Sequence, residues 1–165
     1  MEQLNLFSKL NMSEMKSCAF SGHRNLDKSF SLRKMKTAIR KAIKKGVVNF
    51  YNGMAVGFDM LAAEYVLSLK SKFPNIRLIA CIPCENQEKG FSAKEKEQYY
   101  AILSQADEKV YVSKTYVGGC MLKRNRYMAD RADMLIVHCV KETGGTAYTV
   151  DYFEKKKKGA PIYYV

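Results

Sequence analysis

Short apolar segments alternate with longer segments of helical periodicity along most of this chain. The expected strands cover residues 17–21, 47–51, 76–82, 109–112 and 134–139. The expected helices cover residues 31–45, 59–72, 93–105, 119–131 and 146–157, and the last one leads into residues 161–165. Such alternation is typical of a parallel sheet with helices on both faces. The sequence therefore predicts an α/β protein with a three-layer Rossmann-like fold and a mostly parallel sheet.

The chain length and the apolar pattern together indicate a single domain. A chain of 165 residues is long enough to bury its own core. Residues 1–15 show weak periodicity and are expected to form a leader or peripheral segment, so the domain is expected to span residues 16–165. No stretch approaches the roughly 20 apolar residues that cross a bilayer, and the first residues lack the apolar run of a signal peptide. We therefore expect a cytoplasmic protein with no membrane partner.

The five cysteines do not indicate a metal or redox site. Cys18, Cys81 and Cys139 lie in expected buried strands, where a thiol behaves as a small apolar group. Cys81 and Cys84 form a CxxC pair, but the sequence has no second pair to complete a zinc site, and no helix is expected to open at this pair as in a thioredoxin-like motif. The sequence therefore predicts neither a metal nor a cofactor.

Much of the net charge of +12 is concentrated in residues 33–45 and 155–158. Both segments are expected to be helical, so the cations form either solvated outer faces or a surface that attracts nucleic acid. The sequence favours the solvated faces, because aromatic residues are not interleaved with these cations as they are in a stacking platform. Nucleic acid stays open as a partner, and so does a second copy of the chain.

Polar and glycine-rich segments follow four of the expected strands. These loops contain residues 22–24, 52–57, 83–87 and 141–146. Right-handed crossovers in a parallel sheet bring all the strand carboxyl ends to one edge, and ligands bind at that edge in such sheets. The sequence therefore predicts one binding site, for a phosphate-bearing and nucleotide-like ligand.

Two glycine turns precede expected helices at this edge. Gly53 and Gly57 flank the first turn, and Asp59 is expected to be the N-cap of the helix that follows. Residues 144–146 (Gly-Gly-Thr) repeat the arrangement, and Thr146 is expected either to cap its helix or to donate its hydroxyl group to a phosphate. Glycine lets backbone N–H groups approach a phosphate closely, and a helix N-terminus favours negative charge. Neither turn ends in the Gly-Lys-Ser/Thr of a P-loop.

Charged and polar side chains near the same edge complete the expected site. Arg24 directly follows the first strand, and its planar guanidinium group suits a phosphate. His23 is either a general base or, more commonly for such a residue, bonded to a neighbouring loop. Arg124 and Asn125 are expected near the same edge, whereas Arg126 is expected on the exterior of its helix.

These motifs resemble the DprA/LOG-like nucleotide-binding superfamily, often called SLOG. The resemblance rests on SGHR at residues 21–24, GMAVGFD at 53–59 and KRNRYMA at 123–129. The motifs PCENQ at 83–87 and TGGT at 143–146 are more specifically similar to the YpsA/YoqJ-like branch. The match keeps the motif order from about residue 16 to the end of the sequence, and it implies a Rossmann-like fold and a nucleotide-derived ligand.

Two groups within the superfamily imply alternative functions. LOG-type phosphoribohydrolases cleave nucleoside monophosphates with a catalytic arginine, to which Arg124 corresponds, and with a glutamate three residues after a Gly-Thr pair. This chain has Thr149 where that glutamate is expected, so a hydrolase of N-glycosidic bonds would need Glu85 or Glu142 as its carboxylate. DprA-type proteins bind single-stranded DNA, which leaves a single-stranded nucleic-acid binder as the other alternative.

The favoured interpretation is a protein that binds or senses a nucleotide or a nucleotide-derived molecule, with any enzymatic activity undecided. Its expected ligand-binding residues are Gly22, His23, Arg24, Gly53, Gly57, Asp59, Glu85, Arg124, Asn125, Gly144, Gly145 and Thr146. Glu85 is expected to bond a ribose hydroxyl group or a base, and the candidate catalytic residues are Glu85, Arg124 and Glu142.

Overall fold

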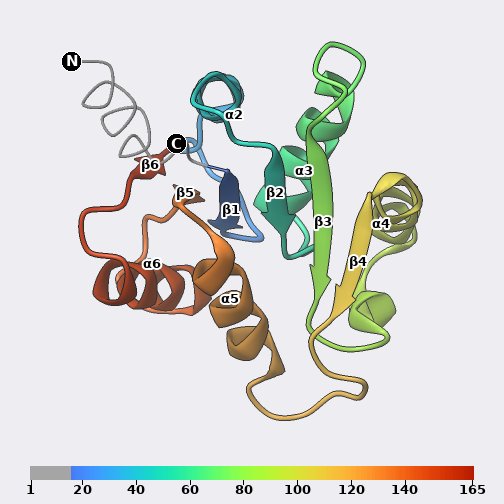
Figure 1. Cartoon of the computed structure of the whole chain (residues 1–165). Helices are drawn as coiled ribbons and strands as arrows, with labels where there is room; N and C mark the ends of the chain where they lie inside the picture. The colour runs from blue at the N-terminus through green and yellow to red at the C-terminus, as the bar shows by residue number, and fades with distance from the viewer. Residues whose placement is uncertain (1–15) are drawn as a thin grey trace, which may run out of the picture.

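The computed structural model describes residues 16–165, which form one six-stranded sheet (Figure 1). The strands are β1 (Ser17–Gly22), β2 (Asn49–Asn52), β3 (Arg77–Ile82), β4 (Glu108–Tyr111), β5 (Met134–His138) and β6 (Ile162–Tyr164). Their order is β4-β3-β2-β1-β5-β6, and every neighbouring pair is parallel. The strand order therefore reverses between β1 and β5. The expected leader at residues 1–15 lies outside the described residues.

Five α-helices connect the strands and cover both faces of the sheet (Figure 1). They are α2 (Leu32–Lys44), α3 (Phe58–Leu69), α4 (Ala93–Gln105), α5 (Cys120–Arg131) and α6 (Gly145–Lys156), with a short 3-10 turn η1 (Gln87–Gly90) before α4. Helices α2, α3 and α4 pack on one face, and α5 and α6 pack on the other. The predicted three-layer Rossmann-like fold is confirmed. Among residues 16–165, the structure contains no helix with the length and apolar character needed to span a membrane.

The alternation of side chains along the strands creates the two core layers. In β5, Met134 and Ile136 join the core beneath α2 and α3, whereas Leu135 and Val137 join the core beneath α5 and α6. Successive residues of a strand point to opposite faces, so a strand that is apolar on both sides must be covered on both sides. All five residues of β5 are buried, which places this strand in the middle of the molecule.

The helices start in two different ways. Side chains cap α2 and α4: Ser31 accepts a hydrogen bond from the backbone of Lys34 at 3.2 Å, and Ser92 and Glu95 form a capping box. In contrast, α3 and α6 begin after Gly57 and Gly144, with no side-chain cap hydrogen bond. Both glycines have positive φ values, of 87° and 104°.

The expectation that Asp59 is the N-cap of its helix is wrong. Gly57 is the N-cap, and Asp59 lies inside α3 as its second residue. A side chain does not fit at Gly57, because a Cβ atom there would lie 2.2 Å from the carbonyl oxygen of Arg24. Thr146 is not a cap either, since Gly144 occupies that position in α6. The Asp59 carboxylate and the Thr146 hydroxyl group therefore do not have the capping role that the sequence suggested.

Candidate functional site

A cavity of about 290 Å³ lies at the carboxyl edge of the sheet, where the strand order reverses between β1 and β5. Ligands bind at such reversals in open parallel sheets. The lining comes from the end of β1, the β2–α3 segment, α5 and the β5–α6 loop: Phe20, Ser21, Gly22, His23, Arg24, Ala55, Asp59, Met121, Leu122, Arg124, Asn125, Met128, Lys141, Thr143, Gly144, Gly145 and Thr146.

Nine of the twelve expected ligand-binding residues lie in this lining. They are Gly22, His23, Arg24, Asp59, Arg124, Asn125, Gly144, Gly145 and Thr146. Gly53 and Gly57 are not in the lining but contact residues that are. Glu85 lies in a separate hollow near η1. Sequence reasoning missed Lys141 and Thr143, although both belong to the loop that it singled out, and Met121, which lies one helical turn before Asn125.

Three of the expected glycines serve close packing within the protein. A Cβ atom at Gly22 would lie 2.3 Å from the Phe58 ring, and one at Gly53 would lie 2.8 Å from the Arg124 guanidinium carbon. Gly57 is confined by the backbone of the β1–α2 loop, as described above. These three glycines are required by the protein interior, whatever the cavity binds.

Gly145, by contrast, borders open space. A Cβ atom there would find only Asn125 Nδ2 nearby, at 3.7 Å, and one at Gly144 would find no atom of the described residues within 4 Å. Gly145 is the first residue of α6, whose first-turn N–H groups have no partner within the helix. The N-terminus of a 12-residue helix is therefore open at the cavity and carries the positive end of the helix dipole.

Two cations line the cavity beside this helix end. Arg24 and Lys141 are both exposed, and neither forms an ion pair with a carboxylate anywhere in residues 16–165. Arg24 lies against the thioether of Met121, with Nη2 3.6 Å from the sulfur. Two unpaired cations and an open helix N-terminus give this part of the cavity a positive potential.

Arg124 lines the cavity from a buried position, and backbone carbonyl groups hold its guanidinium group. Its Nη1 donates to the carbonyl oxygens of Gly53 and Cys81, the latter at 3.3 Å, and its Nε donates to Asn125 Oδ1 at 2.8 Å. Burial lowers the pKa of Arg124, while the nearby Asp59 carboxylate raises it. Because Asn125 Oδ1 is engaged in this way, its amide nitrogen is the group left to meet a ligand near Gly145.

Asp59 is the carboxylate that lines the cavity. The residue is 5% exposed, and its Oδ2 accepts a hydrogen bond from the Ala55 backbone at 3.3 Å. Its Oδ1 is buried and has no hydrogen-bond partner in the part of the chain that the structure describes. Burial raises the pKa of Asp59 to about 6, against the opposing effect of Arg124. A buried acceptor without a donor is uncommon and is expected to be satisfied by water or a ligand.

His23 is bonded to a neighbouring loop, as the sequence interpretation held to be the commoner case. Its Nε2 accepts a hydrogen bond from the Val140 backbone at 3.0 Å, and its ring packs edge-on against His138. Burial, together with the neighbouring His138 and Lys141, lowers the pKa of His23. A neutral imidazole whose acceptor nitrogen is already occupied is poorly suited to be a general base.

The candidate catalytic glutamates do not line the cavity. Glu85 lies beside a hollow of about 250 Å³ with Glu88 and Tyr100, and Glu142 is exposed in the β5–α6 loop. Thr149, at the position where a glutamate was expected, is buried, and its hydroxyl donates to the carbonyl oxygen of Gly145 at 2.8 Å. Within residues 16–165, no three His, Cys, Asp or Glu side chains are grouped so that they would hold a metal ion.

The fold is that of a Rossmann-like α/β protein, with a cavity at the reversal of strand order. A family model matches residues 20–165, and the chain belongs to that family, the YspA SLOG family (YpsA). It is 29% identical to protein YpsA of Bacillus subtilis over 140 residues, which cover 77% of this chain and 78% of that protein. It is 31% identical to the SPbeta prophage-derived protein YoqJ of Bacillus subtilis over 132 residues, with coverage of 73% and 77%.

Solved structures show the same fold. DNA processing protein A (DprA) from Streptococcus pneumoniae superposes with a TM-score of 0.63 at 17% identity, over 94% of this chain and 52% of that chain. DprA from Helicobacter pylori, whose structure describes a single-stranded DNA binding mode, gives a TM-score of 0.63 at 19% identity, over 93% and 66%. The chain thus spans about half of the pneumococcal protein and two thirds of the other. At these identities the likeness is one of fold.

Proposed function

We propose that the cavity binds a small phosphate-bearing molecule derived from a nucleotide, and that the protein acts by binding or sensing it. One observation carries the proposal. The uncapped N-terminus of α6 opens onto the cavity beside two unpaired cations, and the same cavity holds a buried carboxylate with a free oxygen. A ligand with an anionic group and a hydrogen-bond donor matches both features.

The phosphate would lie at the start of α6. Backbone N–H groups at a helix N-terminus bind anions, and Gly145 leaves room for a phosphate to approach them. Arg24 and Lys141 would add charge-assisted hydrogen bonds. The Thr146 side chain, which lines the cavity and is not a cap, would supply a further donor.

The hydroxyl-bearing or base end of the ligand would meet Asp59. A carboxylate accepts hydrogen bonds only, so Oδ1 suits a ribose hydroxyl or an exocyclic amino group. This assigns to Asp59 the role that the sequence interpretation gave to Glu85. A cavity of about 290 Å³ is near the lower end of the range for small-molecule sites, which fits a mononucleotide-sized ligand rather than a dinucleotide.

Hydrolysis of an N-glycosidic bond is the second candidate function, and Asp59 is the observation that favours it. Its carboxylate lies in the cavity near Arg124, with its pKa raised to about 6, as suits a group that exchanges protons near neutral pH. Against hydrolysis, Arg124 is already bonded to backbone carbonyls, and neither Glu85 nor Glu142 lines the cavity. Binding therefore ranks first.

The experiment is a calorimetric comparison of each nucleoside with its monophosphate and diphosphate, and with ADP-ribose. We expect at least one phosphate-bearing compound to bind and its parent nucleoside to bind at least tenfold more weakly. Equal affinity for a nucleoside and its phosphate, or no binding by any phosphate-bearing compound, would refute the assignment of the α6 terminus as a phosphate site.

A further inference from the structure

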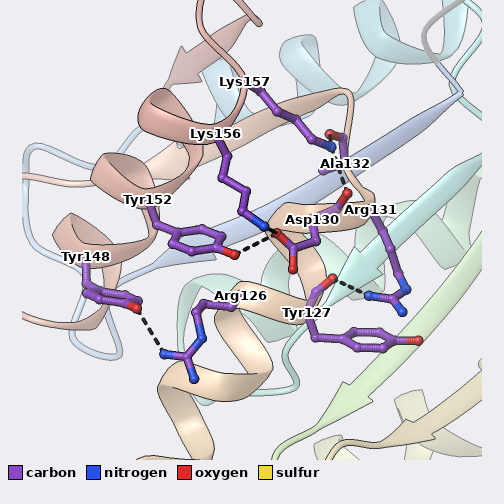
Figure 2. Close-up of polar contacts among 9 residues, drawn as sticks. All are labelled: Arg126, Tyr127, Asp130, Arg131, Ala132, Tyr148, Tyr152, Lys156 and Lys157. Atoms are coloured by element: carbon purple, nitrogen blue, oxygen red, sulfur yellow. Dashed lines mark hydrogen bonds and ion pairs between the residues drawn. The ribbon is translucent and has the colours of Figure 1, made fainter.

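The two segments that concentrate positive charge differ in how the fold treats them. Near the end of α6, Lys155 pairs with Asp151 at 2.9 Å and Lys156 pairs with Asp130 at 3.1 Å. Lys157 donates to backbone carbonyl oxygens of Asp130 and Ala132. Figure 2 shows Lys156, Lys157 and the Tyr152 hydroxyl group gathered around the end of α5. Lys156 and Lys157 therefore join α6 to the end of α5, and Lys155 is paired within α6 itself.

The segment around α2 has no such compensation. The sequence contains no Asp or Glu from residue 28 to residue 58. It carries eight cations in that stretch: Lys28, Arg33, Lys34, Lys36, Arg40, Lys41, Lys44 and Lys45. None of the eight forms an ion pair with a carboxylate of residues 16–165.

The cations of α2 include a row on the side opposite the core. The helix buries Met35, Ala38, Ile39 and Ala42. At 3.6 residues per turn, Arg33, Arg40 and Lys44 fall on the opposite side, and all three are exposed. With a rise of 1.5 Å per residue this row, which we call the α2 basic row, is about 16 Å long.

Like charges spaced four residues apart, such as Lys36 with Arg40 and Arg40 with Lys44, destabilise a helix. Ordinary solvated faces intersperse both signs and avoid this repulsion. In this protein the buried apolar side of α2 holds the helix in place. The repulsion between the cations on its outer side is not offset by any ion pair within residues 16–165. An anionic partner would relieve it.

We propose that the α2 basic row docks the phosphate backbone of double-stranded nucleic acid, without reading its sequence. Anionic membranes are a poorer match, because the apolar side of α2 is buried in the core and only Leu32, at its first residue, is exposed for insertion. Single strands are a poorer match as well, because they are held largely by stacking on exposed rings. The rings near α2 are half-buried and already contact cations of the protein: Arg40 bonds the Tyr65 hydroxyl at 2.7 Å, and Lys45 lies 5.0 Å from the Tyr163 ring centre.

The test compares two variants of equal charge by fluorescence anisotropy with a short mixed-sequence DNA duplex, from low to physiological salt. One variant carries Arg33→Gln, Arg40→Gln and Lys44→Gln. The matched control carries Lys155→Gln, Lys156→Gln and Lys158→Gln. Each phosphate contact contributes about −0.9 to the slope of log affinity against log salt for duplex DNA. For the α2 variant we expect this slope to become less negative by roughly 2 to 3, and the affinity at low salt to fall at least about tenfold. For the control variant we expect much smaller changes in both quantities.

Several outcomes would overturn the proposal. They are equal losses in both triple variants, no duplex binding by the native protein, tighter binding of single strands that the α2 substitutions leave unchanged, or binding to anionic phospholipid vesicles but not to DNA. Circular dichroism and thermal unfolding establish whether each variant is folded. If the triple α2 variant is unfolded, the single variants Arg33→Gln and Lys44→Gln replace it in the same binding measurement. Duplex binding by a Gly145→Val protein is expected to equal that of the native protein, which separates this proposal from that of the cavity.

Discussion

Asp59 and Arg124 both approach Gly53, yet they do not form an ion pair. A Cβ atom at Gly53 would lie 2.8 Å from the Arg124 guanidinium carbon and 2.9 Å from Asp59 Oδ2. The guanidinium group donates instead to backbone carbonyls, and the carboxylate keeps one oxygen free. Two buried opposite charges are thus held close without neutralising each other directly, which leaves the carboxylate available to a ligand.

Gly53→Ala is expected to destabilise the fold by about 1–3 kcal/mol, because the added methyl group must displace both charged side chains in a packed interior. Urea denaturation measures the change in the free energy of unfolding. Gly90→Ala is the control, since a Cβ atom at Gly90 meets nothing within 4 Å in the described structure. A Gly53→Ala protein as stable as the Gly90→Ala protein would show that the contacts around Gly53 yield easily.

Gly145→Val is expected to keep the fold and to abolish binding of the phosphate-bearing ligand identified by calorimetry. The new side chain would occupy the open space in front of the α6 N–H groups, where only Asn125 Nδ2 lies nearby. Thermal unfolding checks the fold and calorimetry checks the binding, with Gly90→Val as the matched control. Unchanged affinity in a folded Gly145→Val protein would place the phosphate elsewhere.

Asp59→Asn is expected to stabilise the protein at neutral pH. Burial raises the pKa of Asp59 from an ordinary value of 3.8 to about 6, so the folded state binds this proton more tightly than the unfolded chain does. The folded protein therefore keeps all of its stability below the unfolded pKa of Asp59, where the carboxyl group is protonated in both states. Part of that stability is lost as the pH rises through about 6, where the buried group has to ionise. A shift of this size corresponds to about 3 kcal/mol at neutral pH.

Urea denaturation of native and Asp59→Asn proteins at several pH values tests this. The stability gained by the variant is expected to be largest above pH 6 and to disappear as the pH falls below the ordinary pKa of 3.8. A difference that is the same at every pH would mean that Asp59 does not titrate differently in the folded protein.

The native protein is expected to release base from AMP, GMP, CMP and UMP far more slowly than about 1 per second, a typical enzyme rate. Cleavage of the glycosidic bond builds positive charge on the ribose, and Thr149 offers no carboxylate where one is needed. Chromatography of released base measures the rate. Turnover near that rate would favour the hydrolase, and its loss in Asp59→Asn but not in Glu85→Gln would identify the carboxylate.

The sequence predicted the layers of the fold well, because each strand of the sheet interior carries its own signal. The five residues of β5 are apolar or buried on both faces, which is possible only beneath helices on both sides. The short edge strand β6 was not assigned, since three residues after Pro161 have too little pattern to distinguish a strand from a chain end.

Some site residues were predicted correctly and others were not, because the alternation of strands and helices along the chain does not determine the order of the strands across the sheet. Glu85 follows β3, and it does reach the carboxyl edge. Yet β2 and β1 separate β3 from β5, which at about 4.8 Å per strand sets its loop roughly 14 Å to the side. Asp59 was mistaken for a cap because a carboxylate two residues after a glycine, at the start of a helix, has the same local pattern in both roles. Its unpartnered oxygen becomes visible only in three dimensions.

The close packing around Gly57 has a consequence for how fast a ligand binds. The Phe58 N–H group donates to the His23 carbonyl oxygen at 3.2 Å, and Gly57 packs against the Arg24 backbone, so the rim that carries Arg24 is fastened to the start of α3. A rim backbone held in this way is organised before the ligand arrives, and little backbone conformational entropy remains to be lost on binding. Association is then governed by diffusional encounter and by attraction to the rim cations, so it slows as salt is added, while ligands of equal charge differ mostly in their rates of dissociation.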